Sequence, residues 1–370
     1  MSAVVVAGAL ASKPDNGGEA WVRLTWALGL AELGLQVRLV ESADVAPDSA
    51  AADWFERVTT WAGLAGRATL LDVHGTALHG PGRADLLALA DDGAMLIDLS
   101  GTLEPELLQS FRHRAYVDLD PGWTQLWDAA GLLGDTLDRY DSHFTVGHAV
   151  SSCGLPQSGR RWHSVRPPVL LSAWPALAPR PGPLTTVGSF RGPSGTMEVA
   201  GRRLGGKVHE WRTYADLPAL VDQDVVAVVA AHPADGGDLE RLRAGGWSLR
   251  DPADVAHPGD YRAFVQQSAG ELSVAQEMYV ATGCGWTSDR SAGYLASGRP
   301  VVVQDTALSA ELVDSPAFWA FTTQAQAVTA CRYLAAADPA EISTAARNLA
   351  RRTFATDVVL PRVLDLGAES

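Results

Sequence analysis

The residues from 283 to 292, GCGWTSDRSA, combine side chains and spacing that suit the binding of an anion. Two glycines loosen a loop, two hydroxyls follow, and Ser288 or Asp289 can cap a helix that begins there. The unpaired N–H groups and the positive dipole end of such a helix attract negative charge. Arg290 adds a forked donor that fits a phosphate. The segment therefore predicts a phosphate-binding loop at the start of a helix over Asp289–Ser297.

The predicted helix is followed by the sequence GRP at 298–300 and by an apolar run, VVV, that predicts a buried strand over Pro300–Gln304. Asp305 and Thr306 come directly after this strand. Ligand loops of parallel sheets lie at the carboxyl ends of strands. These two polar residues are therefore expected on the same sheet edge as the phosphate-binding loop.

The stretch Gly270–Leu308 resembles the donor-binding region of bacterial nucleotide-sugar-dependent glycosyltransferases of the GT-B fold. The resemblance rests on the loop 285–291, on GRPVV at 298–302 and on QDT at 304–306. It implies an α/β fold with two Rossmann-like domains facing a cleft, the second of which binds the nucleotide. No Glu of the family's E-x7-E pattern occupies the 289–297 helix, which leaves ribose recognition and stereochemistry open.

The same resemblance implies a set of donor-binding residues around the second domain's strand ends. Lys207 follows two glycines after the strand Leu184–Ser189, in a region where GT-B enzymes place a basic residue on the diphosphate. Trp286 lies beside the loop, and indoles stack on sugar faces. The predicted donor-binding residues are Ser189, Lys207, Trp286, Ser288, Asp289, Arg290, Ser291, Asp305 and Thr306.

A loop with paired glycines, ALASKPDNGGEAW, follows the first predicted strand, Val4–Leu10. It matches neither the dinucleotide fingerprint nor the P-loop. In the resembling fold this loop faces the cleft and bounds the acceptor and the donor phosphates, although an ordinary turn into a helix explains the same residues equally well. The predicted acceptor and phosphate loop residues are Lys13, Asn16, Gly17 and Gly18.

An inverting sugar transfer needs a general base near the acceptor hydroxyl, and the first domain is expected to supply it. Asp120 is the first choice, because Asp-Pro-Gly in VDLDPGWTQ turns outward at the carboxyl end of a strand. The predicted catalytic residues are Asp120, Asp15 and His148, and comparable strand ends carry Asp72, His74 and Asp98.

The tripeptide Asp118-Leu119-Asp120 also spells DxD, which holds a metal in the GT-A glycosyltransferases. Two α/β halves favour the GT-B fold instead, where binding is usually metal-independent. The nine histidines show no metal-ligand spacing, so no metal site is predicted. No cofactor is expected besides the nucleotide-diphosphate sugar as co-substrate.

Apolar runs alternate with amphipathic stretches through both halves of the chain, as a parallel α/β sheet requires. In the first half, strands are predicted at Val4–Leu10, Val37–Glu41, Ala68–Val73, Ala94–Leu99, Ala115–Leu119 and Ser142–Val146. Helices are predicted between them at Gly18–Gly34, Ala51–Leu64, Arg83–Ala90, Glu104–Phe111 and Trp123–Leu133. This pattern indicates one doubly wound domain.

Seven of the 21 prolines fall between Leu155 and Pro183, which predicts an ordered crossing between two domains. After it, strands are predicted at Leu184–Ser189, Val225–Ala230, Trp247–Leu249 and Pro300–Gln304, and a helical region over Gln324–Thr353. The predicted organisation is an acceptor-side domain over 1–154, a linker over 155–183, a donor-nucleotide domain over 184–352 and a tail over 353–370 that returns to the first domain.

The composition limits the partners. With 370 residues and a 47% apolar share the chain is long enough for two cores. A net charge of −14 argues against a nucleic-acid partner held by phosphate contacts. Only Lys13 and Lys207 are lysines. Three scattered cysteines and the absence of a long apolar stretch predict a cytoplasmic protein without a membrane partner.

Together these features predict a glycosyltransferase that moves a sugar from a nucleotide-diphosphate donor to a small-molecule acceptor, in the setting of natural product biosynthesis. Two alternatives stay open. One is an epimerase or phosphorylase of the same fold, and the other is a non-catalytic protein that binds a nucleotide or sugar. The oligomeric state is left open.

Overall fold

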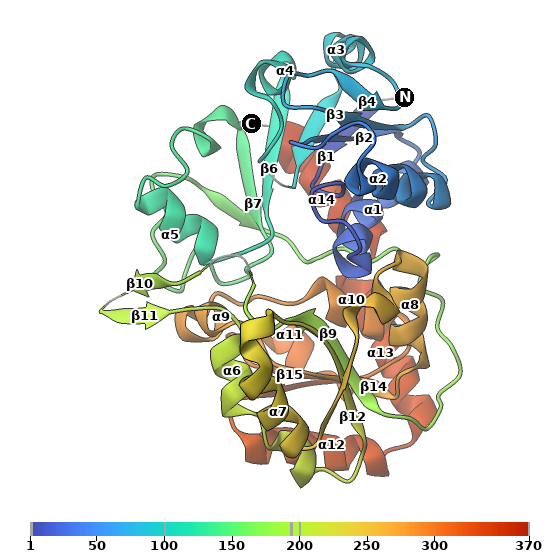
Figure 1. The fold of residues 1–370 in the computed structure, drawn as a ribbon, viewed down its shortest axis with the longest axis vertical. Helices are drawn as coiled ribbons and strands as arrows, with labels where there is room; N and C mark the ends of the chain where they lie inside the picture. The colour runs from blue at the N-terminus through green and yellow to red at the C-terminus, as the bar shows by residue number, and fades with distance from the viewer. Residues whose placement is uncertain (1–2, 100, 193–194, 200, 369–370) are drawn as a thin grey trace.

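The computed structural model describes residues 3–99, 101–192, 195–199 and 201–368, and these form two α/β domains stacked along the long axis (Figure 1). The last two residues of the predicted tail 353–370 lie outside the described residues. The two sheets and their domain arrangement confirm the predicted α/β fold class.

Eight strands of the described chain form the first sheet: β1 (Ala3–Ala7), β2 (Gln36–Ser42), β3 (Ala68–Leu71), β4 (Ala77–His79), β5 (Met95–Asp98), β6 (His113–Asp118), β7 (Ser142–Thr145) and β8 (Trp162–Ser164). Their order is β4-β3-β2-β1-β5-β6-β7-β8, and every pair is parallel except β3 with β4. The order reverses at β1, which lies between β2 and β5. A crevice for ligands is expected beyond the carboxyl ends at such a reversal.

Helices cover both faces of this sheet. Those from the first half of the chain are α1 (Gly17–Glu32), α2 (Ala50–Trp61), α3 (Arg83–Asp91), α4 (Pro105–Ser110) and α5 (Trp123–Ala129), with a 3-10 turn at Leu137–Arg139. Side chains alternate between faces along a strand. Val4 and Val6 accordingly belong to the core under α1 and α2, and Val5 and Ala7 to the core under α3 and α4.

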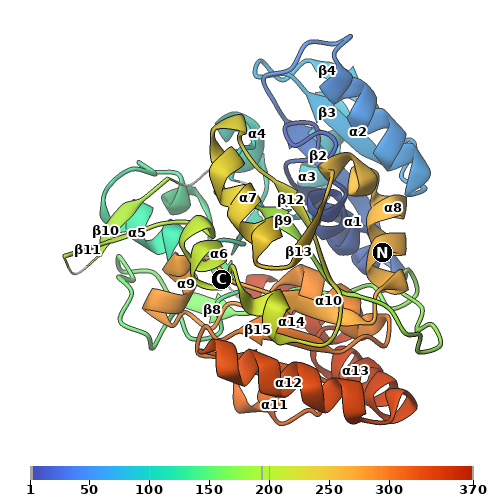
Figure 2. The ribbon, with the colours of Figure 1, turned by 60° about the horizontal axis from the view of Figure 1, so that its bottom comes forward.

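Six described strands form the second sheet: β9 (Leu184–Ser189), β12 (Val225–Ala230), β13 (Trp247–Arg250), β14 (Gly270–Ser273), β15 (Val301–Gln304) and β16 (Phe318–Phe321). The order is β13-β12-β9-β14-β15-β16, with all pairs parallel. The order reverses at β9. A short antiparallel hairpin of β10 (Met197–Val199) and β11 (Arg202–Leu204) extends beside α5 of the first domain (Figures 1 and 2).

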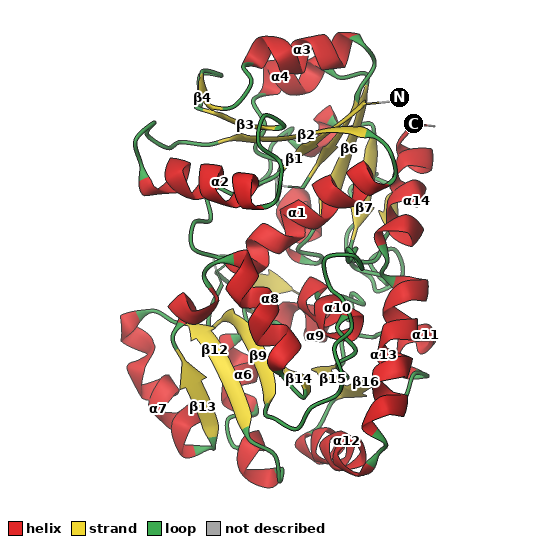
Figure 3. Cartoon of the chain, turned by 90° about the vertical axis from the view of Figure 1, so that its right-hand side faces the viewer, coloured by secondary structure: helices red, strands yellow, loops and turns green. Residues whose placement is uncertain are grey.

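The helices of the second half are α6 (Val208–Thr213), α7 (Gly236–Ala244), α8 (Pro258–Gln267), α9 (Glu277–Thr282), α10 (Asp289–Ala296), α11 (Ala310–Val313), α12 (Gln324–Ala336), α13 (Pro339–Thr353) and α14 (Thr356–Ala368). Three 3-10 turns lie at Leu217–Leu220, Pro233–Asp235 and Pro252–Val255. In the side view, α1 of the first domain reaches down to α8, and α10 lies next to α8 (Figure 3).

Several element predictions need correction. The sequence pattern does not predict β4, β8, β14 or β16, and the helical region over Gln324–Thr353 is broken before Pro339. The first strand ends at Ala7 rather than Leu10, because the N–H of Leu10 donates to the side-chain carboxylate of Glu41 instead of a backbone carbonyl of a neighbouring strand.

We call residues 155–183, which cross between the two domains, the crossing segment. Side chains of the second domain donate hydrogen bonds to carbonyl oxygens of this segment. Arg299, from the GRP sequence, donates to Ala178, and Arg347 of α13 donates to Trp174. Arg262 of α8 donates to Ala173. These bonds satisfy polar backbone groups that proline-rich, irregular chain leaves unpaired.

The chain crosses back to the first domain between α13 and α14. Leu360 and Val363 of α14 join the core beneath the first sheet, where α14 packs against α1 and β6. Figure 1 shows this last helix, in red, among the blue and cyan elements of the first domain. The two crossings are bonded to each other, since the Val169 N–H donates to Phe354 at 2.7 Å and the Thr356 N–H donates to Val169 at 3.2 Å.

Candidate functional site

A cavity of about 340 Å³ lies between the two domains, at the carboxyl ends of both sheets. We call it the interdomain cavity. Its size is in the range of small-molecule sites. Of the predicted site residues, its lining includes Lys13, Asp15, Asn16, Gly18, Asp120, Ser189, Lys207, Trp286, Ser288, Asp289 and Arg290.

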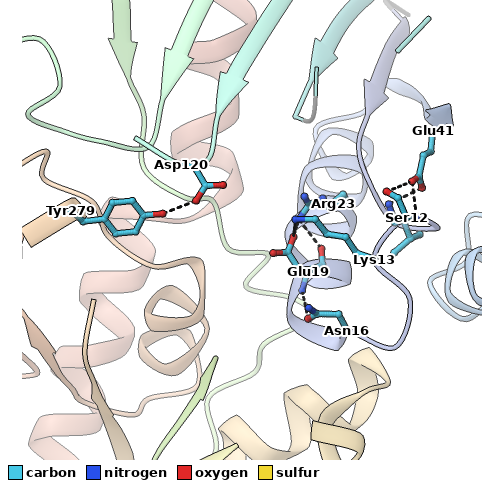
Figure 4. A network of polar contacts seen from close by, with 9 residues as sticks. Ser12, Lys13, Asn16, Glu19, Arg23, Glu41, Asp120 and Tyr279 are labelled. Carbon is cyan, nitrogen blue, oxygen red and sulfur yellow. Dashed lines mark hydrogen bonds and ion pairs between the residues drawn. The ribbon is translucent and has the colours of Figure 1, made fainter. Parts of the chain in front are cut away.

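The loop after β1 is held by one buried carboxylate. Glu41 at the end of β2, 2% exposed, accepts bonds from the backbone N–H groups of Leu10, Ala11 and Ser12 and from the Ser12 hydroxyl (Figure 4). Successive amides that converge on one carboxylate fix the path of the chain. Glu41 therefore determines where the following residues of the loop enter the interdomain cavity.

A charged cluster occupies the start of α1. Glu19 accepts from the Lys13 ammonium at 3.0 Å and pairs with Arg23, while the Asn16 side chain caps the helix by accepting from the Glu19 N–H (Figure 4). Burial opposes ionisation of Glu19, but Arg23 and Lys13 outweigh it and lower the pKa of its carboxyl to about 2. Lys13 is therefore already engaged by a carboxylate.

Gly17 faces the second domain rather than the interdomain cavity. A Cβ at this position would lie 2.6 Å from the Val255 carbonyl oxygen and 2.8 Å from that of His257. Close backbone contact between α1 and the segment before α8 therefore requires a glycine here. The indole N–H of Trp21 strengthens this contact by donating to Pro258 at 2.7 Å.

The charged groups of Lys207 and Arg290 lie close together at the carboxyl end of β9. A Cβ on Gly188 would lie 3.1 Å from Nζ of Lys207 and 3.9 Å from Nη1 of Arg290. Arg290 donates from Nε to Glu271 at 2.7 Å and from Nη1 to the Val187 carbonyl. Its Nη2 is buried and has no partner among the described residues. Arg290 thus combines a structural role with one free donor.

Lys207 forms no ion pair within the described part of the chain, although it is half-buried. Burial and the neighbouring Arg290 guanidinium lower the pKa of its ammonium to about 7. An unpaired lysine at the wall of a cavity is suited to an anion that enters from outside.

The N-terminus of α10 opens onto the same region. Ser288 caps the helix by accepting from the Arg290 N–H at 3.2 Å, and Thr287 before it has a buried hydroxyl that no described residue contacts by a hydrogen bond. Asp289 lies on the first turn of the helix. Burial, and then the charge of Glu19, raise the pKa of its carboxyl.

The loop before α10, residues 283–288, is held by contacts with Ala149 and Thr306, and we call it the donor loop. Gly285 has φ of +72°, and a Cβ there would lie 2.8 Å from the Ala149 nitrogen, so this position requires glycine. The Gly285 N–H donates to the Thr306 carbonyl at 2.6 Å, and the Thr306 hydroxyl donates to the Trp286 carbonyl at 2.7 Å. Thr306 therefore holds the loop without lining the interdomain cavity.

Asp120 and Asp118 of the DxD tripeptide have different surroundings. Asp118 is fully buried and accepts from the side chains of Thr124, Gln125 and Thr145. Asp120 is exposed at the cavity, and its Oδ1 accepts from the Tyr279 hydroxyl at 2.6 Å (Figure 4). No group of three His, Cys, Asp or Glu side chains in the described chain is arranged to hold a metal.

Several predicted residues lie outside the interdomain cavity, in addition to Gly17 and Thr306. His148 is exposed, and its backbone N–H donates to the Gly285 carbonyl. Ser291 faces a small internal cavity behind the loop. Asp305 accepts from the N–H groups of Ala307 and Leu308 and shapes the turn after β15. A strand end is therefore not sufficient for a place in the cavity.

Other cavity residues are not predicted from the sequence. Tyr279 and Gln276 come from α9 and the residue before it, Tyr261 from α8 and Trp174 from the crossing segment. Gln276 and Tyr279 lie within the stretch Gly270–Leu308 that resembles the donor-binding region, but the sequence does not single them out as site residues. Tyr261 and Trp174 belong to no motif.

No helix in the described residues is long and apolar enough to span a bilayer. No protein family and no curated protein matches the chain by sequence. Solved structures, in contrast, match it over essentially its full length.

An alpha-glucosyltransferase in complex with UDP matches with a TM-score of 0.64 and 10% identity, covering 100% of both chains. A TarM variant of S. aureus matches with a TM-score of 0.65 and 8% identity, covering 99% of this chain and 100% of the other. The pneumococcal O-GlcNAc transferase GtfA matches with a TM-score of 0.58 and 10% identity, covering 100% and 99%. This protein has the GT-B fold of glycosyltransferases, as its donor-loop sequence predicts.

Proposed function

We propose that this protein is a glycosyltransferase that moves a sugar from a nucleotide-diphosphate donor to a small-molecule acceptor. The proposal rests on Lys207. Among the described residues this lysine has no ion-pair partner, and its ammonium lies near the Arg290 guanidinium beside the N-terminus of α10. A diphosphate is the anion that this combination fits. The similar alpha-glucosyltransferase was solved with UDP, and UDP is therefore the first ligand to test.

In the proposed reaction the bond between the anomeric carbon and the donor phosphate oxygen breaks, and a bond from the anomeric carbon to the acceptor oxygen forms. Asp120 takes the proton of the acceptor hydroxyl. Lys207, the free Nη2 of Arg290 and the first amides of α10 offset the charge that the leaving diphosphate gains. Trp286 supplies an aromatic face at the wall of the interdomain cavity.

The proposed acceptor is small and is not a polyanion. Asp15, Asp120 and Asp289 line the interdomain cavity without an ion-pair partner among the described residues, and the chain carries a net charge of −14. A nucleic acid would be repelled by this charge. A neutral or cationic compound with a hydroxyl group would not be repelled.

The test is thermal unfolding with UDP, GDP and dTDP, each compared with its nucleoside. At a free concentration of 100 times Kd, a bound diphosphate stabilises the folded chain by about 2.7 kcal/mol. Lys207→Met is expected to weaken this binding about 10-fold or more, because it removes a charge-assisted contact. Failure of all three diphosphates to raise the Tm would contradict the proposal.

Product analysis with a matching sugar donor then separates the alternatives. A transferase needs an acceptor to form its glycoside. An epimerase changes the donor without an acceptor, a phosphorylase transfers the sugar to phosphate, and a non-catalytic binder is stabilised by the nucleotide but leaves the donor unchanged.

A further inference from the structure

A chain of hydrogen bonds crosses from α5 of the first domain to Asp120 by way of the second domain. The indole N–H of Trp123 donates to the Gln276 side-chain oxygen at 3.0 Å. The Gln276 amide nitrogen donates to the Tyr279 hydroxyl at 2.8 Å, and this hydroxyl donates to Oδ1 of Asp120 at 2.6 Å. Each link joins side chains that no sequence motif pairs.

The chemistry of the groups fixes the direction of this chain. An indole nitrogen only donates, so the Gln276 oxygen must face Trp123 and its amino group must face Tyr279. A phenol has one proton, which is therefore free to point at Asp120. Burial, and then the charge of Asp120, raise the pKa of the Tyr279 hydroxyl well above its ordinary value, so it stays a donor.

Asp120 therefore has one carboxylate oxygen that accepts a hydrogen bond and one that is available to a ligand. The Asp120 N–H donates to Asp118, and Tyr279 holds Oδ1. No hydrogen bond from the described residues reaches Oδ2, which is turned away from Tyr279 (Figure 4). Without Tyr279, an exposed aspartate would be free to rotate about its side-chain bonds.

We propose that Tyr279 is the positioning residue that aims Oδ2 of Asp120 at the acceptor hydroxyl, with Gln276 and Trp123 setting the direction of its proton. This inference rests on the proposed function, because it needs Asp120 to be the base. Tyr279 also contacts the donor loop, since its ring centroid lies 4.6 Å from that of Trp286 with an interplanar angle of 32°. The acceptor base and the donor loop are thus held by the same side chain.

The other charged and titratable groups around Asp120 come from both domains. Asp118 and Tyr116 belong to β6, and Lys207 precedes α6 in the second domain. Asp118 has its own buried donors, and neither it nor Lys207 bonds to Asp120 among the described contacts. Loss of the Tyr279 hydroxyl therefore acts on Asp120 without breaking these neighbours' bonds.

The test is Tyr279→Phe, which keeps the ring on Trp286 and removes the single hydroxyl. Loss of this donor frees Oδ1 of Asp120, so Oδ2 faces the acceptor hydroxyl for only part of the time. We expect kcat to fall about 10- to 100-fold while the Kd of UDP stays within about 2-fold of wild type. Gln276→Leu should lower kcat by a smaller factor, also without a change in the Kd of UDP.

Tyr140→Phe is the matched control. Tyr140 donates to Asp98 at 2.7 Å in the first domain, and neither residue lines the interdomain cavity. This variant should lower the Tm and leave kcat within about 2-fold of wild type. A wild-type kcat in Tyr279→Phe would overturn the positioning role. If Tyr279→Phe does not fold, a wild-type kcat in Gln276→Leu overturns it instead.

Asp120→Asn separates this inference from the proposed function. Transfer at the wild-type rate by Asp120→Asn would remove Asp120 as the base and with it the proposed mechanism. Loss of transfer in Asp120→Asn together with a wild-type kcat in Tyr279→Phe would leave the base in place and refute only the role of Tyr279.

Discussion

The place of Lys207 in the molecule alters the chemistry of its side chain. Its pKa, lowered to about 7, means that a large share of this amine is neutral at pH 8 in the empty cavity. Because this value lies below the ordinary 10.5, the lysine makes folding less favourable below about pH 7, and the penalty fades as the pH rises from 7 to 10.5. An anion beside it favours the ammonium form, so above about pH 7, where the free amine is largely neutral, the anion binds with proton uptake.

With two lysines in the chain, amine labelling can be assigned residue by residue. We expect an acylating reagent to modify Lys207 with a midpoint near pH 7, and saturating UDP to protect it. Mass spectrometry separates Lys207 from Lys13, which serves as the internal comparison. Labelling of Lys207 that starts only above pH 9, or that UDP leaves unchanged, would contradict this expectation.

The residues of the candidate site differ in how far the sequence predicts them. Ser288, Asp289 and Arg290 are contiguous, and one helix start brings them to the cavity wall, so local pattern is sufficient. Glu41 lies 29 to 31 residues from the amides that it binds, and Tyr279 lies 159 residues from Asp120. Such contacts form only in the assembled sheets, and no rule of sequence spacing predicts them.

At the scale of elements, the sequence pattern predicts most strands of both sheets but not β14. Strand β14, GELS, has a charged residue at its second position, which disfavours a buried strand. Glu271 is nevertheless fully buried because Arg290 of α10 pairs with it. The compensation comes from another element, so the local pattern cannot predict the central strand of the second sheet.

The contact between α1 and the second domain leads to a prediction about Gly17. Gly17→Ala is expected to destabilise the chain by about 1 to 3 kcal/mol, because its methyl group would meet two backbone carbonyls that cannot rotate away. Gly236→Ala at the start of α7 is the control, since its Cβ meets nothing within 4 Å. Chemical denaturation of both variants measures the difference, and equal stabilities would show that α1 and α8 separate at little cost.

At the scale of the whole molecule, the last helix completes the first domain. A Cβ on Gly29 of α1 would lie 2.5 Å from the Thr356 side chain, and one on Gly367 would lie 2.2 Å from that of Met95. Both ends of α14 are therefore in tight contact with the first domain. The two-domain layout is predictable from the alternating pattern, whereas this packing depends on contacts between residues more than 200 positions apart.

Deletion of residues 355–370 should therefore affect the distant half of the chain. We expect hydrogen exchange to accelerate in β6 and β7, which lose the cover of α14, while β12 and β15 keep their protection. Equal acceleration in both sheets would indicate that the domains unfold as one unit. Unchanged exchange in β6 and β7 would indicate that α14 adds no stability there.

The bonded pair of crossings at Val169 and Phe354 has a consequence for turnover. Since the covalent links between the domains meet at one place, the proposed transferase has a single pivot about which its domains would open to release a spent nucleotide. The bonds from Tyr279 to Asp120 and from Trp21 to Pro258 also join the two domains, so we expect such an opening to break them. We therefore expect these contacts to slow product departure rather than sugar transfer.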